Sequence, residues 1–244
     1  MYREEYIPLH RNDELLYYRK PMEKLIKHLK EFDNNRTESI NSGIIWNEVE
    51  VGKCFYPCAE VFLCNGYFLL NDEYVLDLGS IELYYHEEYD GGIKDHAMYH
   101  TNERLPQSYK DKLKKYSPEK LPYFYKVIYE HSGYPYFKIG SFNLHQSGVD
   151  ITFENEEKGY RASFLIRAYR MQKKDDFNNE NILYDPCSSH LYDDMYNAGL
   201  LSIGNNSTIV WVEYPKGGRV IQRPRRNLDD KPWQFMLEGL KEIK

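Results

Sequence analysis

The chain begins with a segment whose apolar residues recur at helical spacing. Between residues 13 and 32, leucine, isoleucine, methionine and phenylalanine side chains fall three or four positions apart, as on one face of a helix. Pro21 interrupts this segment and predicts the start of a second helix, because proline is tolerated in a first helical turn but not in mid-helix. The polar run from Asn34 to Gly43 predicts a loop. We therefore expect an N-terminal helical segment over residues 1–42.

Short strands are predicted after this segment. Three β-branched and aromatic runs follow one another, and Asn-Gly and Asn-Asp dipeptides separate them, which is typical of β-hairpins. These runs are residues 61–64, 67–70 and 74–76. The clearest hairpin extends from Gly148 to Arg170, where residues of alternating polarity flank a polar turn at 155–159.

The other segments complete a mixed pattern. Residues 86–106 predict a long polar loop, and loops of this length are often functional. The other expected elements are a helix within 107–130, a helix capped by Ser188 or Ser189 and ending near Gly199, a strand at 208–213, a turn at Gly217-Gly218, and a final helix or strand from Pro232. Residues 43–244 thus predict a β-rich α+β unit, and the whole chain a single domain with a mostly antiparallel sheet and peripheral helices.

Composition narrows the class of protein. With 41% hydrophobic and 16% aromatic residues, the 244-residue chain can bury a sizeable core. A mean hydropathy of -0.74, no apolar run near the ~20 residues of a membrane span and no signal-peptide pattern at the start predict a cytoplasmic protein without a membrane partner. Four cysteines do not suggest a secreted disulfide scaffold.

Two features of composition bear on partners. The net charge of -6 argues against a surface that binds phosphate backbones throughout, but a local basic groove is compatible with it. The 24 tyrosines are compatible either with codon bias or with an aromatic-lined pocket. Basic residues cluster late in the sequence, and they either share one face or are scattered over the surface: Arg161, Arg167, Arg170, Arg219, Arg223, Arg225 and Arg226.

The strand before the long loop carries the first candidate for catalysis. Period-2 alternation places Glu82 and Tyr84 on one face, and Ile81, Leu83 and Tyr85 on the other. A carboxylate next to an aromatic ring can polarise a water molecule while the ring stacks on a planar substrate. The alternative is a solvent-facing glutamate at the end of a strand.

Other chemistries have weaker support. His96 and His100 have the i, i+4 spacing of metal ligands, but they lie in a predicted loop and lack a His-Glu-x-x-His motif. Cys54, Cys58 and Cys64 do not have a recognised zinc spacing, and two buried thiols and one exposed thiol are the simpler interpretation. Nucleotide-binding and serine-hydrolase motifs are absent from the sequence, so we expect neither a metal nor an organic cofactor.

Several short motifs occur in an order that points to a known family. They are Ile81-Glu82-Leu83-Tyr84, Asp95–His100, Ser163–Ala168, Pro186–Leu191, Val210–Glu213, and Pro224–Leu228 followed by Lys231–Phe235. Taken together, they resemble the alkylpurine (3-methyladenine, alkyladenine-type) DNA glycosylases over about residues 75–237. The wedge tyrosine of that family has no counterpart at Gln146-Ser147-Gly148, and its pocket asparagine would fall near Glu154 or Asn155.

The resemblance implies a fold similar to that of the methylpurine-DNA glycosylases and a role for each matching residue. Glu82 would be the general base, and Arg167 would orient the attacking water or a phosphate. Side chains that would bind the flipped base are Tyr84, Tyr99 and His100. Side chains that would contact the DNA backbone are Arg161, Arg225 and Arg226.

Three functional hypotheses follow. The first is hydrolysis of the N-glycosidic bond of an alkylated purine flipped from DNA. The second is a non-catalytic relative that binds nucleic acid or a protein partner. The third is an unrelated α+β protein, for example a hydrolase that uses the loop carrying His96 and His100. The first two differ in whether Glu82, Tyr84, His100 and Arg167 converge on one site.

Overall fold

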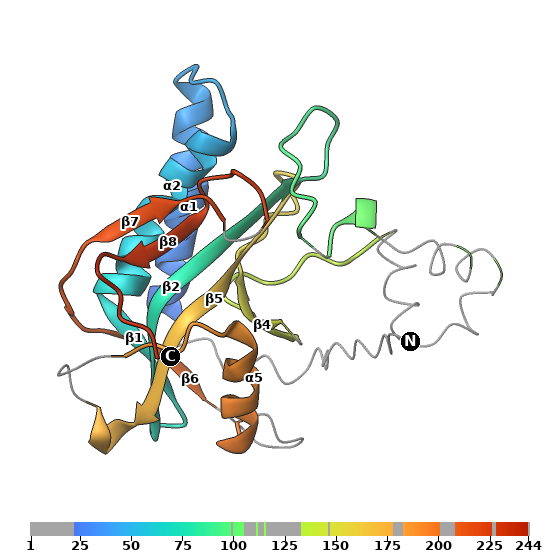
Figure 1. The fold of residues 1–244 in the computed structure, drawn as a ribbon. Coiled ribbons are helices and arrows are strands. Elements are labelled where there is room, and N and C mark those ends of the chain that lie inside the picture. Colours follow the sequence, from blue (N-terminus) through green and yellow to red (C-terminus); the bar gives the residue numbers. More distant parts are fainter. Residues whose placement is uncertain are drawn as a thin grey trace.

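A long antiparallel pair of strands, β2 (Tyr74–Glu87) and β5 (Tyr160–Lys173), forms the centre of the fold (Figure 1). The computed structural model describes residues 22–98, 100–104, 111, 115, 133–145, 147–177, 183–200, 208–225 and 228–243. The β2–β5 ladder is continuous except for a bulge at Gly79 of β2 and a second register shift, one pair further on, at Arg167 of β5. A bulge of this kind bends a strand and increases its twist.

The bulge allows β2 to change neighbours along its second edge. Before the bulge, β2 pairs with β1 (Gly66–Leu70), which in turn pairs with β6 (Ile209–Glu213). After the bulge, β2 pairs with β8 (Gln234–Leu237), and β8 pairs with β7 (Val220–Arg223). Beyond β5 lie β4 (Gly148–Thr152) and β3 (Phe142–His145). The result is a curled, antiparallel sheet in a single α+β domain.

Two helices cover one face of this sheet and build the main core. They are α1 (Glu23–Asn41) and α2 (Glu48–Cys64), which lie behind β2 in Figure 1. Asn47 begins α2 by accepting hydrogen bonds from the amides of Val49 and Glu50. Phe55 of α2 stacks on Phe153 with ring centroids 5.4 Å apart. Because aromatic rings bury large apolar areas, these contacts fix the helices on the sheet.

The third described helix, α5 (Ser188–Asn197), packs against β4 and β5 through Leu191 and Met195. Its first turn approaches Gly148 so closely that an added Cβ would lie 2.8 Å from the Cβ of Ser188. Gly148 also has φ +136°, so glycine is needed there for two reasons. The described residues also form two 3-10 turns, Asn102–Arg104 and Lys174–Asp176. Among the described helices, none has the length and apolar character that crossing a bilayer requires.

Two sequence predictions about this region are wrong. Residues 61–64 belong to α2 and not to a strand, since a four-residue apolar run is also compatible with a helix that is buried on most sides. Residues 34–41 continue α1 and do not form a loop. The polar residues there include Arg36, which is buried because its Nε donates to the Tyr85 hydroxyl at 2.8 Å and its Nη2 to Glu87 at 2.8 Å. Tertiary contacts thus outweigh local propensity.

Most other predicted elements are confirmed. The hairpins at 67–76 and 148–170, the helix ending near Gly199, the strand at 208–213 and a strand after Pro232 are all present. The predicted serine cap of α5 is wrong, because Cys187 occupies the N-cap position and its side chain makes no capping hydrogen bond. The helices predicted at 13–21 and 107–130 lie outside the described residues, apart from two single positions.

We expect Phe55→Ala to lower the free energy of unfolding by about 3 to 5 kcal/mol, because it leaves a cavity in the aromatic core. Val49→Ala is the matched control on the same helix, since half of Val49 is exposed, and it should cost within about 0.5 kcal/mol. Urea unfolding measures both values. Equal losses would contradict the position of the core described here.

Candidate functional site

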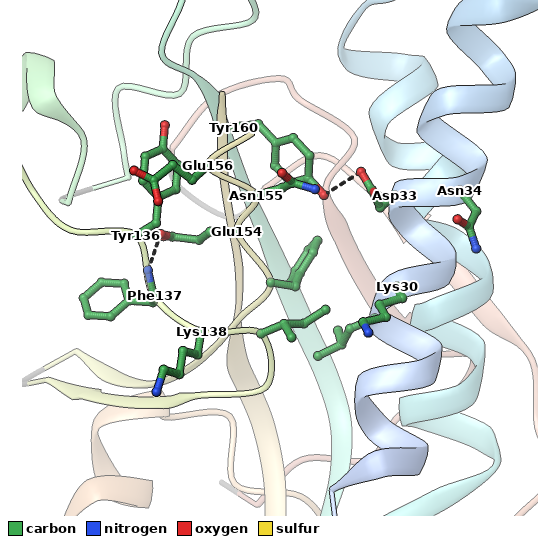
Figure 2. A pocket seen from close by; sticks show the side chains of 13 residues that line it. Lys30, Asp33, Asn34, Tyr136, Phe137, Lys138, Glu154, Asn155, Glu156 and Tyr160 are labelled. Carbon is green, nitrogen blue, oxygen red and sulfur yellow. Dashed lines mark hydrogen bonds between the residues drawn. The ribbon is translucent and has the colours of Figure 1, made fainter. Parts of the chain in front are cut away.

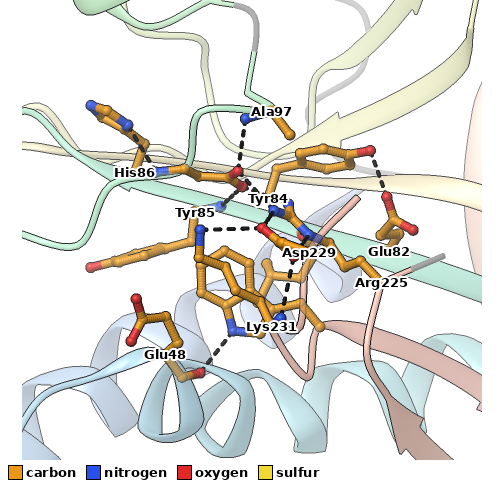
Figure 3. Close-up of polar contacts among 12 residues, drawn as sticks. Glu48, Glu82, Tyr84, Tyr85, His86, Ala97, Arg225, Asp229 and Lys231 are labelled. Atoms are coloured by element: carbon orange, nitrogen blue, oxygen red, sulfur yellow. Dashed lines mark hydrogen bonds and ion pairs between the residues drawn. The ribbon is translucent and has the colours of Figure 1, made fainter. Parts of the chain in front are cut away.

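Glu82, Tyr84 and Arg167 meet on the sheet face opposite α1 and α2. The Tyr84 hydroxyl donates to Glu82 Oε1 at 2.6 Å, and Arg167 Nη2 donates to the same oxygen at 2.7 Å. Arg167 Nη2 also lies 3.3 Å from the Tyr84 hydroxyl oxygen. Figure 3 shows Tyr84 and Glu82 joined by their hydrogen bond. We call these three residues the Glu82 cluster.

The strand register explains why these residues meet. Glu82 lies opposite Leu165, and Tyr84 lies opposite Ser163, so the side chains of all four share one face. Arg167 lies at a register shift two residues beyond Leu165, and its hydrogen bond to Glu82 Oε1 places its side chain on the same face. The alternation predicted for Glu82 and Tyr84 is therefore confirmed. The alternative of a solvent-facing glutamate is wrong, because Glu82 is fully buried.

Burial and charge set the protonation of the two partners of Glu82. Burial raises the pKa of the Tyr84 hydroxyl, and the negative charge of Glu82 raises it further. Burial would lower the pKa of Arg167, but the hydrogen bond and charge of Glu82 outweigh it and raise that pKa. At neutral pH the cluster therefore holds a neutral phenol and a guanidinium cation, and both donate to one carboxylate oxygen.

The second carboxylate oxygen of Glu82 distinguishes it from the other acids of β2. Both oxygens of Asp77 and both oxygens of Glu87 accept hydrogen bonds or ion pairs from protein groups. Glu82 Oε2 is also buried, but among the described residues it has no hydrogen-bond partner. Arg167 Nε is likewise buried and has no hydrogen-bond partner among the described residues. Buried polar atoms are normally paired, so these two atoms mark a place for a water molecule or a ligand.

The same face carries further polar atoms that sequence analysis did not single out. His86 continues the alternation of Glu82 and Tyr84, and its Nε2 is buried without a hydrogen-bond partner among the described residues. Burial lowers the pKa of His86, although Glu88, with a carboxylate oxygen 3.9 Å away, partly opposes this effect. Extending the period-2 pattern by two residues would have identified His86 from the sequence.

Arg225, which we expected to contact DNA, lies inside the protein. Its Nη1 and Nη2 form a bidentate pair with Asp95 at 2.7 and 2.9 Å, and its Nε donates to Asp229 at 3.0 Å. The guanidinium lies 5.1 Å from the centroids of both the Tyr84 and Trp233 rings, and Figure 3 shows Arg225 next to Tyr84 and Asp229. A fully buried guanidinium with its donors occupied cannot also bind a phosphate, so the expected DNA contact is wrong for Arg225.

The expected DNA contact of Arg161 is wrong for the same reason. It is fully buried, donates to the carbonyl oxygens of Tyr134 and Pro135 at 2.7 and 3.0 Å, and forms an ion pair with Glu88. His100, expected to bind a base, is buried against Glu154, which is the partner of its Nε2. Tyr99 and Arg226 lie outside the described residues.

The alternative metal site is not formed by the two loop histidines. The His96 side chain is 81% exposed, whereas His100 is buried. Within the described ranges, no group of three or more His, Cys, Asp or Glu side chains is placed to hold a metal ion. Cys54, Cys58 and Cys64 are all buried, so the expectation that one of these thiols is exposed is wrong. Burial raises the pKa of Cys54 to about 11 and of Cys58 to about 12.

No family model, curated protein or solved structure matches this chain. The function of the Glu82 cluster therefore has to be inferred from its own residues and contacts.

We expect Arg225→Gln to destabilise the protein by about 3 to 5 kcal/mol, because it leaves two carboxylates without their buried cation. Arg219→Gln is the control: Arg219 is exposed and lies 3.8 Å from Glu238, so its loss should cost within about 0.5 kcal/mol. Equal stability of the two variants in urea unfolding would contradict a structural role for Arg225.

The same variant should change the pH dependence of stability. Burial would raise the pKa of Asp229, but the hydrogen bonds and charge of Arg225 outweigh it and lower that pKa. An aspartate whose pKa is lowered by folding stabilises the protein at pH values above its pKa in the unfolded chain, about 3.9. This stabilisation is lost as the pH falls through the pKa of the folded protein. As the pH falls below about 4, the free energy of unfolding should therefore decrease less for Arg225→Gln than for the unaltered protein. Parallel urea midpoints across this range would contradict the expectation.

Proposed function

We propose that the protein is a glycosylase-like hydrolase that cleaves the N-glycosidic bond of an alkylated purine flipped out of DNA, with the Glu82 cluster as its catalytic centre. The observation that carries the proposal is a buried glutamate whose Oε2 has no hydrogen-bond partner among the described residues, while its other oxygen accepts from Tyr84 and Arg167. Glu82 and Arg167 are 85 positions apart in the chain and belong to separate motifs of the glycosylase resemblance. Their contact is what a shared catalytic role requires.

The proposed reaction uses Glu82 as a general base. Its Oε2 accepts a proton from a water molecule, and the water oxygen forms a bond to the sugar C1′. The bond from C1′ to the purine nitrogen breaks, and its electron pair leaves with the base. The negative charge of Glu82 also stabilises the oxocarbenium-like transition state. Arg167 supplies a fixed positive charge that orients the water, and the Tyr84 ring stacks on the flipped base.

The fold and the location belong to the same proposal. We infer that the curled sheet is a distant variant of the methylpurine-DNA glycosylase fold. In that fold the strand that carries the catalytic carboxylate would lie next to the strand that carries the arginine, as β2 lies next to β5 here. A cytoplasmic location agrees with the four free cysteines, since thiols persist in a reducing compartment. Because Arg161 and Arg225 are buried, other cationic side chains would contact the DNA backbone. One of them is Arg167, whose side chain is 28% exposed.

A second candidate is a non-catalytic relative that binds nucleic acid or a protein. The observation that favours it is the engagement of Glu82 Oε1 by two donors in a fully buried position. A carboxylate held in this way can also serve only to hold β2 and β5 together. The two candidates differ in whether base release depends on Glu82.

We expect Glu82→Gln to reduce release of 3-methyladenine, 7-methylguanine or hypoxanthine by about 10² to 10⁴-fold, the usual contribution of a general base. Binding of damaged DNA should persist, because the amide keeps the size of the side chain and removes one negative charge. The control is Glu73→Gln, an exposed glutamate just before β2, which should leave release unchanged. The assay measures free base liberated from damaged duplex and single strands.

Two results would end this proposal. Release by Glu82→Gln at the rate of the unaltered protein would exclude Glu82 as the base. If the unaltered protein liberates none of the three bases yet binds DNA at low salt, the non-catalytic candidate is the correct one.

A further inference from the structure

A cavity separate from the Glu82 cluster lies between α1, the segment before β3 and the turn that joins β4 to β5 (Figure 2). Its volume is about 480 Å³, within the range typical of small-molecule sites. Its walls thus come from three stretches of the chain that are far apart in sequence and that the fold brings together.

The inner part of the cavity is apolar and aromatic. Leu29 of α1 and Phe153 line it, each only 1% exposed, together with Ile139 and the rings of Tyr136 and Tyr160. Aromatic and aliphatic walls of this kind favour a planar apolar body.

Two of the three carboxylates that line the cavity, Asp33 and Glu154, already have partners, and the third, Glu156, is exposed. Asp33 accepts hydrogen bonds from the Tyr160 hydroxyl at 3.1 Å and from Lys158 Nζ at 2.8 Å. Glu154 accepts from the amide of Phe137 at 2.7 Å and is also paired with His100. A ligand therefore does not need to supply a cation to either acid.

Two lysines at the edge of the cavity have no acidic partner in the part of the chain that the structure describes. Lys30 and Lys138 line the cavity and are exposed, and no described acidic side chain lies within ion-pair distance of either one. Some other surface lysines of the described residues have such partners, for example Lys24 with Glu213 and Lys174 with Asp72, whereas Lys27, Lys173 and Lys241 do not. In Figure 2, Lys30 on α1 and Lys138 on the segment before β3 border the cavity from its two sides.

We infer that this cavity binds a small amphipathic anion, a planar aromatic body that carries a carboxylate, sulfonate or phosphate group. The aromatic body packs against Leu29, Phe153 and the tyrosine rings, and the acidic group faces Lys30 and Lys138. The inference concerns a second site and does not depend on the proposed glycosidic activity.

Two fluorescent probes that differ only by the acidic group test the inference. The first is 8-anilinonaphthalene-1-sulfonate, and the second is its uncharged parent, N-phenyl-1-naphthylamine. Both are titrated into the full chain, the Lys30→Gln/Lys138→Gln variant and the matched control Lys24→Gln, which lies on the same helix outside the cavity. An Ile139→Trp variant, which fills the cavity, tests where the probe binds.

The sulfonate probe should bind with a stoichiometry of one and more tightly than its uncharged parent. Loss of both lysines should weaken sulfonate binding by about tenfold, the combined effect expected of two exposed charges, and should leave the parent unaffected. Ile139→Trp should weaken binding of both probes, and Lys24→Gln should weaken neither. The inference is overturned by an absence of sulfonate binding, by several equivalent sites, or by unchanged affinity in the lysine or Ile139→Trp variants.

Discussion

The pairing of buried charges on β2 is the interaction on which the rest of the structure depends. This strand lies in the middle of the sheet, and its three acidic residues are almost completely buried. An unpaired charge in such a position would be very costly, so each acid has an arginine from another element. The pairs are Asp77 with Arg170, Glu82 with Arg167 and Glu87 with Arg36. They join β2 to β5 twice and to α1 once.

The three pairs do not serve the same purpose. Asp77 and Glu87 are saturated by neighbouring donors, and the Glu87 pair helps to hold α1 on the sheet through Arg36. Glu82 has a partner at only one oxygen among the described residues, and its arginine reaches solvent. We interpret the first two pairs as structural and the third as functional, because incomplete pairing in a buried position lowers stability unless a ligand or a reaction uses it.

The sequence predicted those parts of the fold that depend on local patterns. Alternation along β2 and β5 identified the face shared by Glu82 and Tyr84, and the hairpin of Gly148 to Arg170 was found from its polarity alone. The helical course of 34–41 could not be predicted, because its polar residues are stabilised by the distant partners of Arg36. The identity of α2 at 61–64 likewise depends on the strands packed around it.

Charge was the least predictable feature of the site. The sequence alone does not show which of Arg161, Arg167 and Arg225 is buried and which is exposed. Their number in this part of the chain suggested a basic surface. The structure uses Arg161 and Arg225 inside the protein, where carboxylates from the 88–95 loop neutralise them. Whether an arginine faces DNA or a buried acid depends on long-range contacts, and composition contains no information about these.

The central claim is that Glu82 is the one acid of β2 that is not required for stability. Urea unfolding of three single variants tests this claim most directly. Asp77→Asn removes the carboxylate that faces the buried Arg170, and Glu87→Gln removes the one that faces the buried Arg36, so each should cost about 3 to 5 kcal/mol. Glu82→Gln leaves Arg167 able to reach water and should cost less than about 1 kcal/mol. A loss for Glu82→Gln as large as for the other two variants would contradict the account and assign Glu82 a structural role.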